Sequence, residues 1–195
     1  MGMKKNITFL LAVLVAMPAC KSEKKESEKK FVSVLSIIES QVAHVDTSLY
    51  SIIKIEQTDS LQSDTTYIPR EEFRAAAKDF LSIPDLSDNK VAKRYKEETM
   101  YDKTINRVVI TYTPENPAKE EIQKQELLVT PNAASGDKIN NIIINRVINN
   151  RDSFMQKNML WQMDKSFQVV TTLQKPGTPE KTTTVQVTWN EDRDQ

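Results

Sequence analysis

The first apolar pattern behind the N-terminal segment has the spacing of a helix. Its members recur every three or four residues and would form one stripe along a helix face: Leu35, Ile38, Val42, Val45, Leu49 and Ile52. Because no Gly or Pro interrupts residues 31–57, the pattern favours one long helix over that range. The alternative ends the helix at Asp46-Thr47-Ser48, which could serve as a cap, and makes the β-branched segment 50–56 a strand.

A second, shorter helix is predicted at residues 70–82, after a polar loop at 57–67. Pro69 suits the start of a helix, and the acidic pair that follows falls in the first turn, where the helix dipole favours it. Apolar side chains then recur at helical spacing, and Pro84 ends the pattern. Residues 85–94 read as a connection.

From about residue 95 to 190 the chain changes to short alternating apolar and polar runs separated by turns. This texture is typical of an antiparallel meander. The candidate strands are 95–102, 105–113, 122–130, 138–149, 154–163, 167–174 and 182–190.

The last three of these strands allow an argument about register. A three-residue turn at 164–166 would pair Trp161 with Val169, and a five-residue loop at 176–180 would pair Phe167 with Trp189. Both choices gather the large apolar side chains on one face of the sheet. We therefore expect Trp161 and Trp189 on the same face and at least partly buried.

Helices followed by strands indicate an α+β fold within one domain, residues 31–195. The helices 31–57 and 70–82 would pack on one face of a curved antiparallel meander of about six to seven strands. The helical stripe needs an apolar partner and the apolar sheet face needs a cover, so each would bury the other.

The N-terminus has the three parts of an export signal. Lys4 and Lys5 supply positive charge, a short apolar run follows, and small Ala19 precedes the expected cleavage point. The apolar run at 7–19 is shorter than the roughly 20 residues that cross a bilayer. The sequence therefore predicts a signal peptide at residues 1–19.

Cys20, the only cysteine, follows this signal immediately. The arrangement of Ala19 and Cys20 resembles that of bacterial lipoproteins of the Gram-negative type, although Met17 and Pro18 depart from the usual box. The resemblance implies cleavage between Ala19 and Cys20, a diacylglycerol on the thiol and an acylated amine. Two or three acyl chains would hold the protein firmly on a membrane.

Residues 20–30 would be the lipidated cysteine and a charged flexible tether, because nothing apolar follows the cysteine there. By resemblance to lipoproteins, Lys21 behind the cysteine favours the outer membrane over the inner one. We expect a cell-envelope location, either periplasmic or surface-facing.

The charge balance and the scarcity of glycine narrow the possible functions. The chain carries 27 basic and 27 acidic side chains, so it lacks the basic excess of a nucleic-acid-binding protein. It contains only 3 glycines, too few for a Gly-rich phosphate loop or a dinucleotide-binding motif. We expect no cofactor and no metal.

Candidate catalytic residues are few. His44, the only histidine, lies off the helical stripe, and no nearby residue looks like a partner nucleophile or an orienting carboxylate. Adjacent glutamates occur at 71–72, 97–98 and 120–121, and neighbours on a strand point to opposite faces. Asn141, Asn145 and Asn149 would share one strand face; such a row can bind sugars, but more often it is simply exposed.

The leading hypothesis is a non-catalytic, membrane-anchored envelope lipoprotein with an interaction or structural role. Its partners would be the membrane, through the lipid on Cys20, and envelope proteins. One alternative is a carrier or receptor for a lipid or other hydrophobic ligand held between helix and sheet. An enzyme is a second alternative, and a coiled-coil dimer through the stripe at 35–52 is a further possibility.

Overall fold

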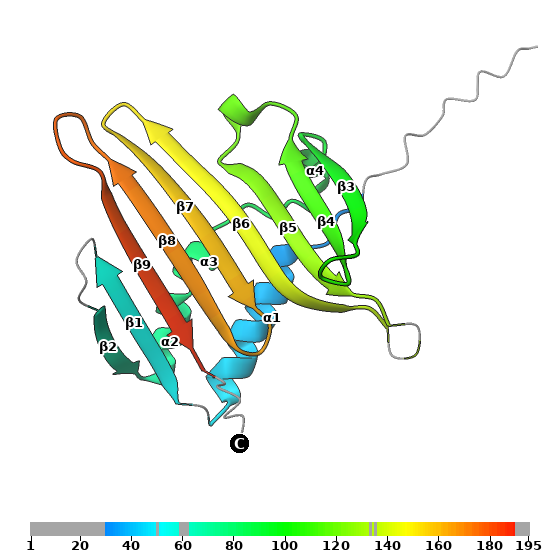
Figure 1. Cartoon of the computed structure of the whole chain (residues 1–195), viewed down its shortest axis with the longest axis horizontal. Helices are drawn as coiled ribbons and strands as arrows, with labels where there is room; N and C mark the ends of the chain where they lie inside the picture. The colour runs from blue at the N-terminus through cyan, green and yellow to red at the C-terminus, as the bar shows by residue number, and fades with distance from the viewer. Residues whose placement is uncertain (1–29, 50, 59–62, 133, 135, 190–195) are drawn as a thin grey trace, which may run out of the picture.

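The computed structural model describes residues 30–49, 51–58, 63–132, 134 and 136–189. The signal peptide, Ala19, Cys20 and nearly all of the tether therefore lie outside the described residues. Within those that are described, the chain forms an antiparallel sheet of nine strands in the order β2-β1-β9-β8-β7-β6-β5-β4-β3 (Figure 1). The strands are β1 (Ile52–Thr58), β2 (Ser63–Ile68), β3 (Tyr95–Asp102), β4 (Arg107–Pro114), β5 (Ile122–Thr130), β6 (Lys138–Asn150), β7 (Ser153–Gln162), β8 (Ser166–Gln174) and β9 (Lys181–Thr188).

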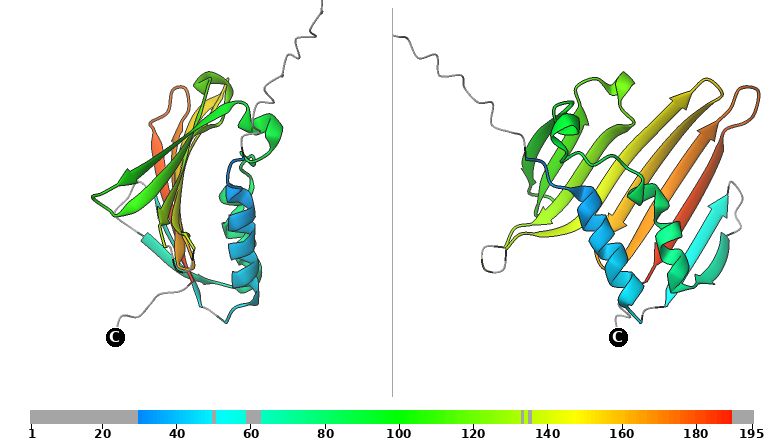
Figure 2. Two further views of the ribbon diagram at one scale, coloured as in Figure 1. Left: turned by 90° about the vertical axis from the view of Figure 1, so that its right-hand side faces the viewer. Right: turned by 180° about the vertical axis from the view of Figure 1, so that it is seen from behind.

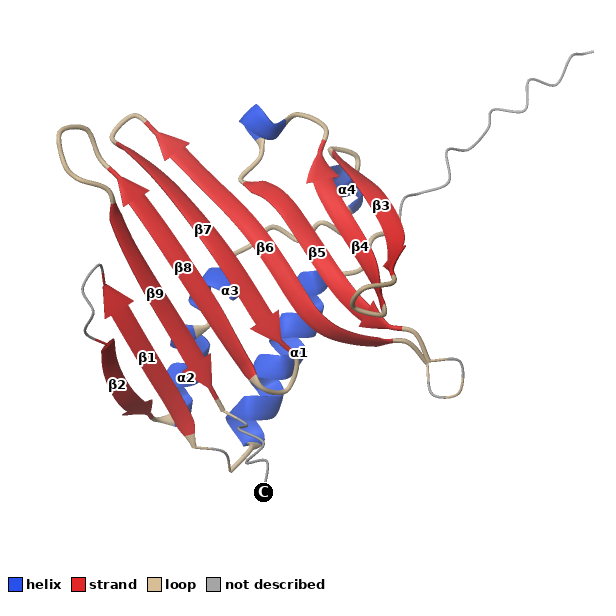
Figure 3. Ribbon diagram, viewed as in Figure 1, coloured by secondary structure: helices blue, strands red, loops and turns tan. Residues whose placement is uncertain are grey.

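The helices lie against one face of this sheet, which we call the inner face; the opposite face is the outer face (Figure 2). They are α1 (Val34–Thr47), α2 (Arg70–Ala76), α3 (Lys78–Leu81) and α4 (Asn89–Ala92), with a 3-10 turn, η1 (Pro117–Lys119). Helix α1 runs obliquely across the sheet, and α2 and α3 lie beside it (Figure 3). Strand, rather than helix, is the main component of the fold.

An aromatic cluster fills the space between α2, α3 and the centre of the sheet. The rings of Phe80 and Trp161 meet edge to face at 5.0 Å, as do those of Phe73 and Trp189. Trp161 also stacks on Phe167 at 5.2 Å. Trp161 and Trp189 are buried on the same face, which confirms the expectation from the sequence. Such pairs each contribute about 0.5–1.5 kcal/mol beyond their buried area.

The hairpin registers are shifted by two residues from the predicted ones. Trp161 pairs with Phe167 rather than Val169, and Phe167 pairs with Val187 rather than Trp189. A shift of two keeps every side chain on its face, so the faces are as predicted although the pairs are not. The cause is the position of the first turn, at 163–165, and the greater length of the last loop, at 174–180.

The predicted long helix 31–57 is wrong, because α1 ends at Thr47. The hydroxyl of Thr47 donates to the carbonyl of His44, and both the backbone N–H and the hydroxyl of Ser48 donate to that of Val45. These bonds occupy carbonyls that the next turn of a helix would use. Leu49, placed on the stripe by its spacing, is 93% exposed. Strand β1 follows, as the alternative interpretation had it.

The predicted fold class is also wrong in its balance of elements. Residues 63–68, read as part of a polar loop, form strand β2, so nine strands replace the expected six to seven. The helix predicted at 70–82 is two short helices interrupted at Ala77. The seven strands predicted beyond residue 95 are confirmed to within about two residues at each end, the usual margin for such boundaries.

A reciprocal pair of hydrogen bonds fixes α1 on the sheet. The amide nitrogen of Gln41 donates to the Asp164 carboxylate at 2.8 Å, and the backbone N–H of Asp164 donates to the Gln41 amide oxygen at 2.8 Å. Asp164 has a positive φ of 60° in the turn between β7 and β8. The turn that sets the β7–β8 register therefore also positions the helix.

The N-terminal end of the domain is anchored on Tyr112. Its hydroxyl accepts a hydrogen bond from the backbone N–H of Val32 at 3.1 Å, and its ring lies 4.5 Å from that of Phe31. Burial, together with nearby Glu97, raises the pKa of the Tyr112 hydroxyl to about 12. Burial and Glu120 raise the pKa of Tyr95 further still. Both side chains are therefore neutral at physiological pH.

We predict that Phe80→Ala destabilises the domain by about 3–5 kcal/mol, because it removes a ring that contacts Trp161 and Phe167 and leaves a cavity. Leu49→Ala is the matched control, since Leu49 is exposed and its truncation should change the free energy of unfolding by less than about 0.5 kcal/mol. Urea unfolding monitored by tryptophan fluorescence measures both. Equal effects from the two variants would contradict the proposed core.

Candidate functional site

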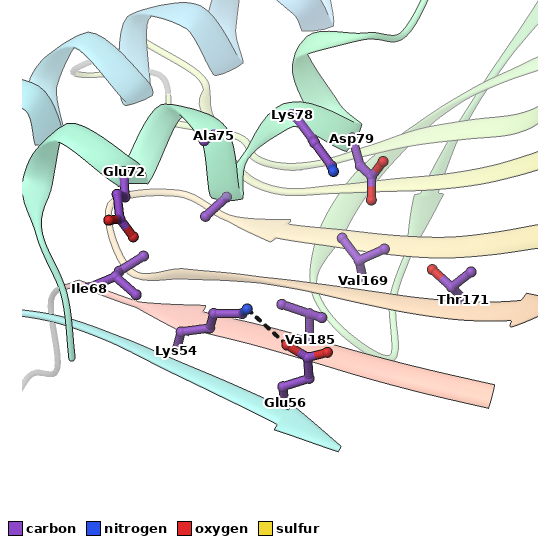
Figure 4. A pocket seen from close by; sticks show the side chains of 11 residues that line it. Lys54, Glu56, Ile68, Glu72, Ala75, Lys78, Asp79, Val169, Thr171 and Val185 are labelled. Atoms are coloured by element: carbon purple, nitrogen blue, oxygen red, sulfur yellow. Dashed lines mark ion pairs between the residues drawn. The ribbon is translucent and has the colours of Figure 1, made fainter. Parts of the chain in front are cut away.

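A cleft opens between the helices and the sheet at the side where β1 lies (Figure 4). Its volume is about 460 Å³, and it is lined by β1, β2, α2, α3, β8 and β9. Aliphatic side chains from the strands form its floor, chiefly Ile68, Val169 and Val185. The cleft lies directly beside the aromatic cluster, where the short helices no longer cover the inner face.

Charged side chains of both signs surround this floor. They are Lys54 and Glu56 from β1, Glu72 from α2, and Lys78 and Asp79 from α3. Strand alternation explains why Lys54 and Glu56 project on the same side, since residues two apart share a face. Their ammonium and carboxylate groups are 2.8 Å apart. A cleft of this composition suits a small ligand that has an apolar part and charges of both signs.

A second ion pair connects α3 to the sheet at the edge of the cleft. Nζ of Lys157 on β7 lies 2.6 Å from the Asp79 carboxylate, and both side chains are largely buried. The cross-strand neighbour of Lys157 is Arg146, whose guanidinium lies 2.7 Å from Glu121. Lys157 and Arg146 therefore each have a carboxylate partner, and these partners offset the repulsion between the two neighbouring cations.

The residues singled out in the sequence are dispersed over the structure. His44 lies in the last turn of α1 and is exposed. Glu97 and Glu98 point to opposite faces of β3, while Glu120 and Glu121 hold Arg94 and Arg146 in ion pairs. The structure does not bring these groups together. The cleft residues Lys54, Glu56 and Asp79 had no sequence signal, because only the folded structure brings β1 and α3 to the same cleft.

The helix–sheet interface that a carrier would use is occupied. The aromatic cluster packs ring against ring there, and its members are buried. Two polar groups in this core, the indole N–H of Trp161 and the side-chain amide of Gln125, have no hydrogen-bond partner among the described residues. Side chains therefore fill the interface where this cluster packs, and the open space between helix and sheet lies beside it, in the cleft.

The outer face of the sheet has an unusual composition over six neighbouring strands. Among the described residues, none that points outward from β2, β1, β9, β8, β7 or the 141–149 segment of β6 is charged, in a chain with 28% charged residues. We call this surface the neutral face. Most of its side chains are amides or hydroxyls: Gln57, Ser63, Thr65, Asn141, Asn145, Asn149, Gln156, Asn158, Gln162, Ser166, Gln168, Thr172, Gln174, Thr182, Thr184, Gln186 and Thr188. The others are aliphatic or aromatic: Ile53, Ile55, Tyr67, Ile143, Val147, Phe154, Leu160 and Val170.

The neutral face has a sharp boundary. On the next strand, β5, the outward residues Lys124 and Glu126 form an ion pair at 3.1 Å, and charged residues continue on β4 and β3. Lys138, at the start of β6, lies beyond the bulge that separates it from Asn141. The six strands do carry charges, but on the inner face, such as Lys54 and Glu56 at the cleft and the paired Lys157 on β7. Uncovered sheet faces normally carry the charges, so this distribution is reversed.

None of the three comparisons, with family models, with curated proteins and with solved structures, finds a match to this chain. Within the described ranges, no helix has the length and apolar character needed to span a bilayer. In the same part of the chain, no three His, Cys, Asp or Glu side chains are grouped so that they could hold a metal ion.

We predict that Asp79→Ala destabilises the domain by about 1–3 kcal/mol, because it leaves the largely buried Lys157 without its partner. Glu56→Ala is the control. It removes the carboxylate of the more exposed pair with Lys54 and should change the free energy of unfolding by less than about 1 kcal/mol.

The same series tests the pairing itself. Adding Lys157→Met to Asp79→Ala should recover part of the lost stability, because no buried charge then remains unpaired. Urea unfolding of Asp79→Ala, of Lys157→Met and of the double variant gives the coupling energy between the two side chains. Additive effects of the two substitutions would show that the ion pair does not connect α3 to the sheet.

Proposed function

We propose that this protein is a non-catalytic lipoprotein of the bacterial cell envelope. Cys20 carries the lipid, residues 20–30 form the tether, and the domain docks on another envelope component through its neutral face. The signal-like residues 1–19 and the position of Cys20 support the anchor. The neutral face supports the docking role.

The neutral face is the observation on which this proposal depends. Docking surfaces lose their charged residues at the centre, because a charge that is buried without a partner costs several kcal/mol. The neutral face has this depletion across six strands, and the described helices leave it uncovered. Turn residues at its two ends, Arg151 and Asp152 on one side and Lys165 on the other, supply a charged rim.

Anchoring makes a weak docking surface effective. A lipid on Cys20 and a short tether would confine the domain to a layer beside the membrane, which raises its effective concentration toward neighbours there. Moderate affinity per contact is then sufficient for stable attachment, as expected for a surface of half-exposed polar side chains.

The cleft favours an enzyme as a second candidate, because Glu56, Glu72 and Asp79 all line it. Two of these carboxylates are each bound to a lysine, Glu56 to Lys54 and Asp79 to Lys157. We therefore assign them a charge-balancing role and keep the non-catalytic function as the main proposal.

The anchor is tested by Cys20→Ser. Wild-type protein should be found in the membrane fraction, incorporate labelled palmitate and begin at a modified Cys20 by mass spectrometry. Cys20→Ser should lose the label and the modified N-terminus, because it has no sulfur to acylate. Ser22→Ala is the control and should behave as wild type. A free thiol on the processed wild-type protein would overturn the anchor.

Docking through the neutral face is tested in the intact envelope with a photo-cross-linking amino acid. Placed at Gln168, in the middle of the neutral face, it should give adducts of increased mass in gels. Placed at Thr113, on the outer side of β4 beyond the charged boundary, it should give few. Equal yields at the two positions would argue against a docking role for the neutral face.

A further inference from the structure

We propose that the partner of the neutral face is a neutral polysaccharide, and that Asn149, Phe154 and Gln174 form a subsite for one sugar ring at its end. This inference rests on the docking role proposed above and adds the chemical class of the partner.

The three subsite residues lie side by side on neighbouring strands. Phe154 on β7 is the register partner of Asn149 on β6 and of Gln174 on β8. All three are exposed, and Phe154 retains 36% of its surface, which is unusual for a phenylalanine in a strand. They line a hollow of about 330 Å³ between the β6–β7 turn and the β8–β9 loop.

This arrangement provides the two kinds of contact that a sugar ring requires. The ring of Phe154 offers a flat apolar surface for the C–H groups on one side of a pyranose. The amides of Asn149 and Gln174 flank that surface, and each can donate and accept hydrogen bonds to ring hydroxyls. Strand spacing places neighbouring side chains about 4.5–5.5 Å apart, close enough for one ring to contact all three.

The rest of the neutral face continues the same chemistry along the strands. Amide and hydroxyl side chains repeat across it, as in the row of Gln186 and Gln168, and aliphatic residues such as Leu160 and Ile143 continue that row. A polymer of neutral sugars presents hydroxyls and C–H surfaces along its whole length. Each buried amide would therefore find a partner, which avoids the cost of about 1–3 kcal/mol for an unsatisfied polar group.

The composition disfavours other occupants. An acidic polymer would be attracted by cations along its length, and among the described residues the strands of the neutral face present none outward. The two cations near the subsite, Arg151 and Lys175, line the hollow from its turns and belong to the subsite alone. A second copy of the sheet, packed face to face, would need interdigitating apolar side chains to form a core. Here the apolar residues are scattered among amides, so such a core would bury many polar groups without partners.

The test uses the full lipidated protein in a detergent without a sugar headgroup. Native gels contain either hydroxyethylcellulose as the neutral polysaccharide, polygalacturonate as the acidic one, or no polymer. We expect retardation by hydroxyethylcellulose alone. Phe154→Ala and Gln168→Arg should each raise the apparent dissociation constant for hydroxyethylcellulose by about tenfold or more.

Two controls match these variants. Tyr101→Ala removes an exposed aromatic ring from β3, which lies outside the neutral face, and Thr113→Arg adds a charge to the outer side of β4. Both should be retarded as strongly as wild type. Light scattering on the same samples measures whether the protein is monomeric.

Several outcomes would overturn the inference. These are no retardation by the neutral polymer, retardation by polygalacturonate alone, equal effects of the test and control variants, or a dimer that Gln168→Arg dissociates. In each of these cases, the palmitate label and the Gln168 cross-links decide what is lost. If both are retained, the proposed function stands and only the polysaccharide is ruled out. If the cross-links are lost, the docking role is ruled out as well.

Discussion

The packing of the aromatic cluster against the inner face of the sheet is the constraint on which the structure depends. A nine-stranded sheet with one apolar face is not stable until that face is covered. Phe73 and Phe80 from the short helices meet Trp161, Phe167 and Trp189 from the strands and bury the centre of that face. Helices α2 and α3 cover this centre with one side and line the cleft with another.

The sequence predicted the C-terminal part of the fold well, because its information is local. Alternation places Trp161, Phe167 and Val187 on one face for any turn with an odd number of residues. The predicted cross-strand pairs were wrong, because the sequence does not reveal which residues near a turn remain paired in the sheet. Alternation is a property of each strand, whereas register is a property of the turn.

The N-terminal part was predicted poorly because two patterns overlap there. The apolar stripe continues through Leu49 and Ile52 at helical spacing, yet hydroxyl groups at residues 47 and 48 take up the last carbonyls of α1. Strand β2 gave no signal, because an edge strand exposed on both faces needs no alternation. The neutral face was equally hidden, since it depends on which strands are neighbours, although the asparagines at 141, 145 and 149 indicated part of it.

The pairing of β1 with β9 has a consequence for how the chain acquires its structure. Ile53 lies opposite Thr188, so the hairpin of β1 and β2 joins the rest of the sheet only when the last strand has been delivered, whereas β3 to β9 follow one another as adjacent hairpins. Contacts between such distant segments form late because a long loop must be closed first. In a chain exported as we propose, α1, β1 and β2 would cross the membrane first and wait. Completion of the sheet would thus coincide with completion of translocation.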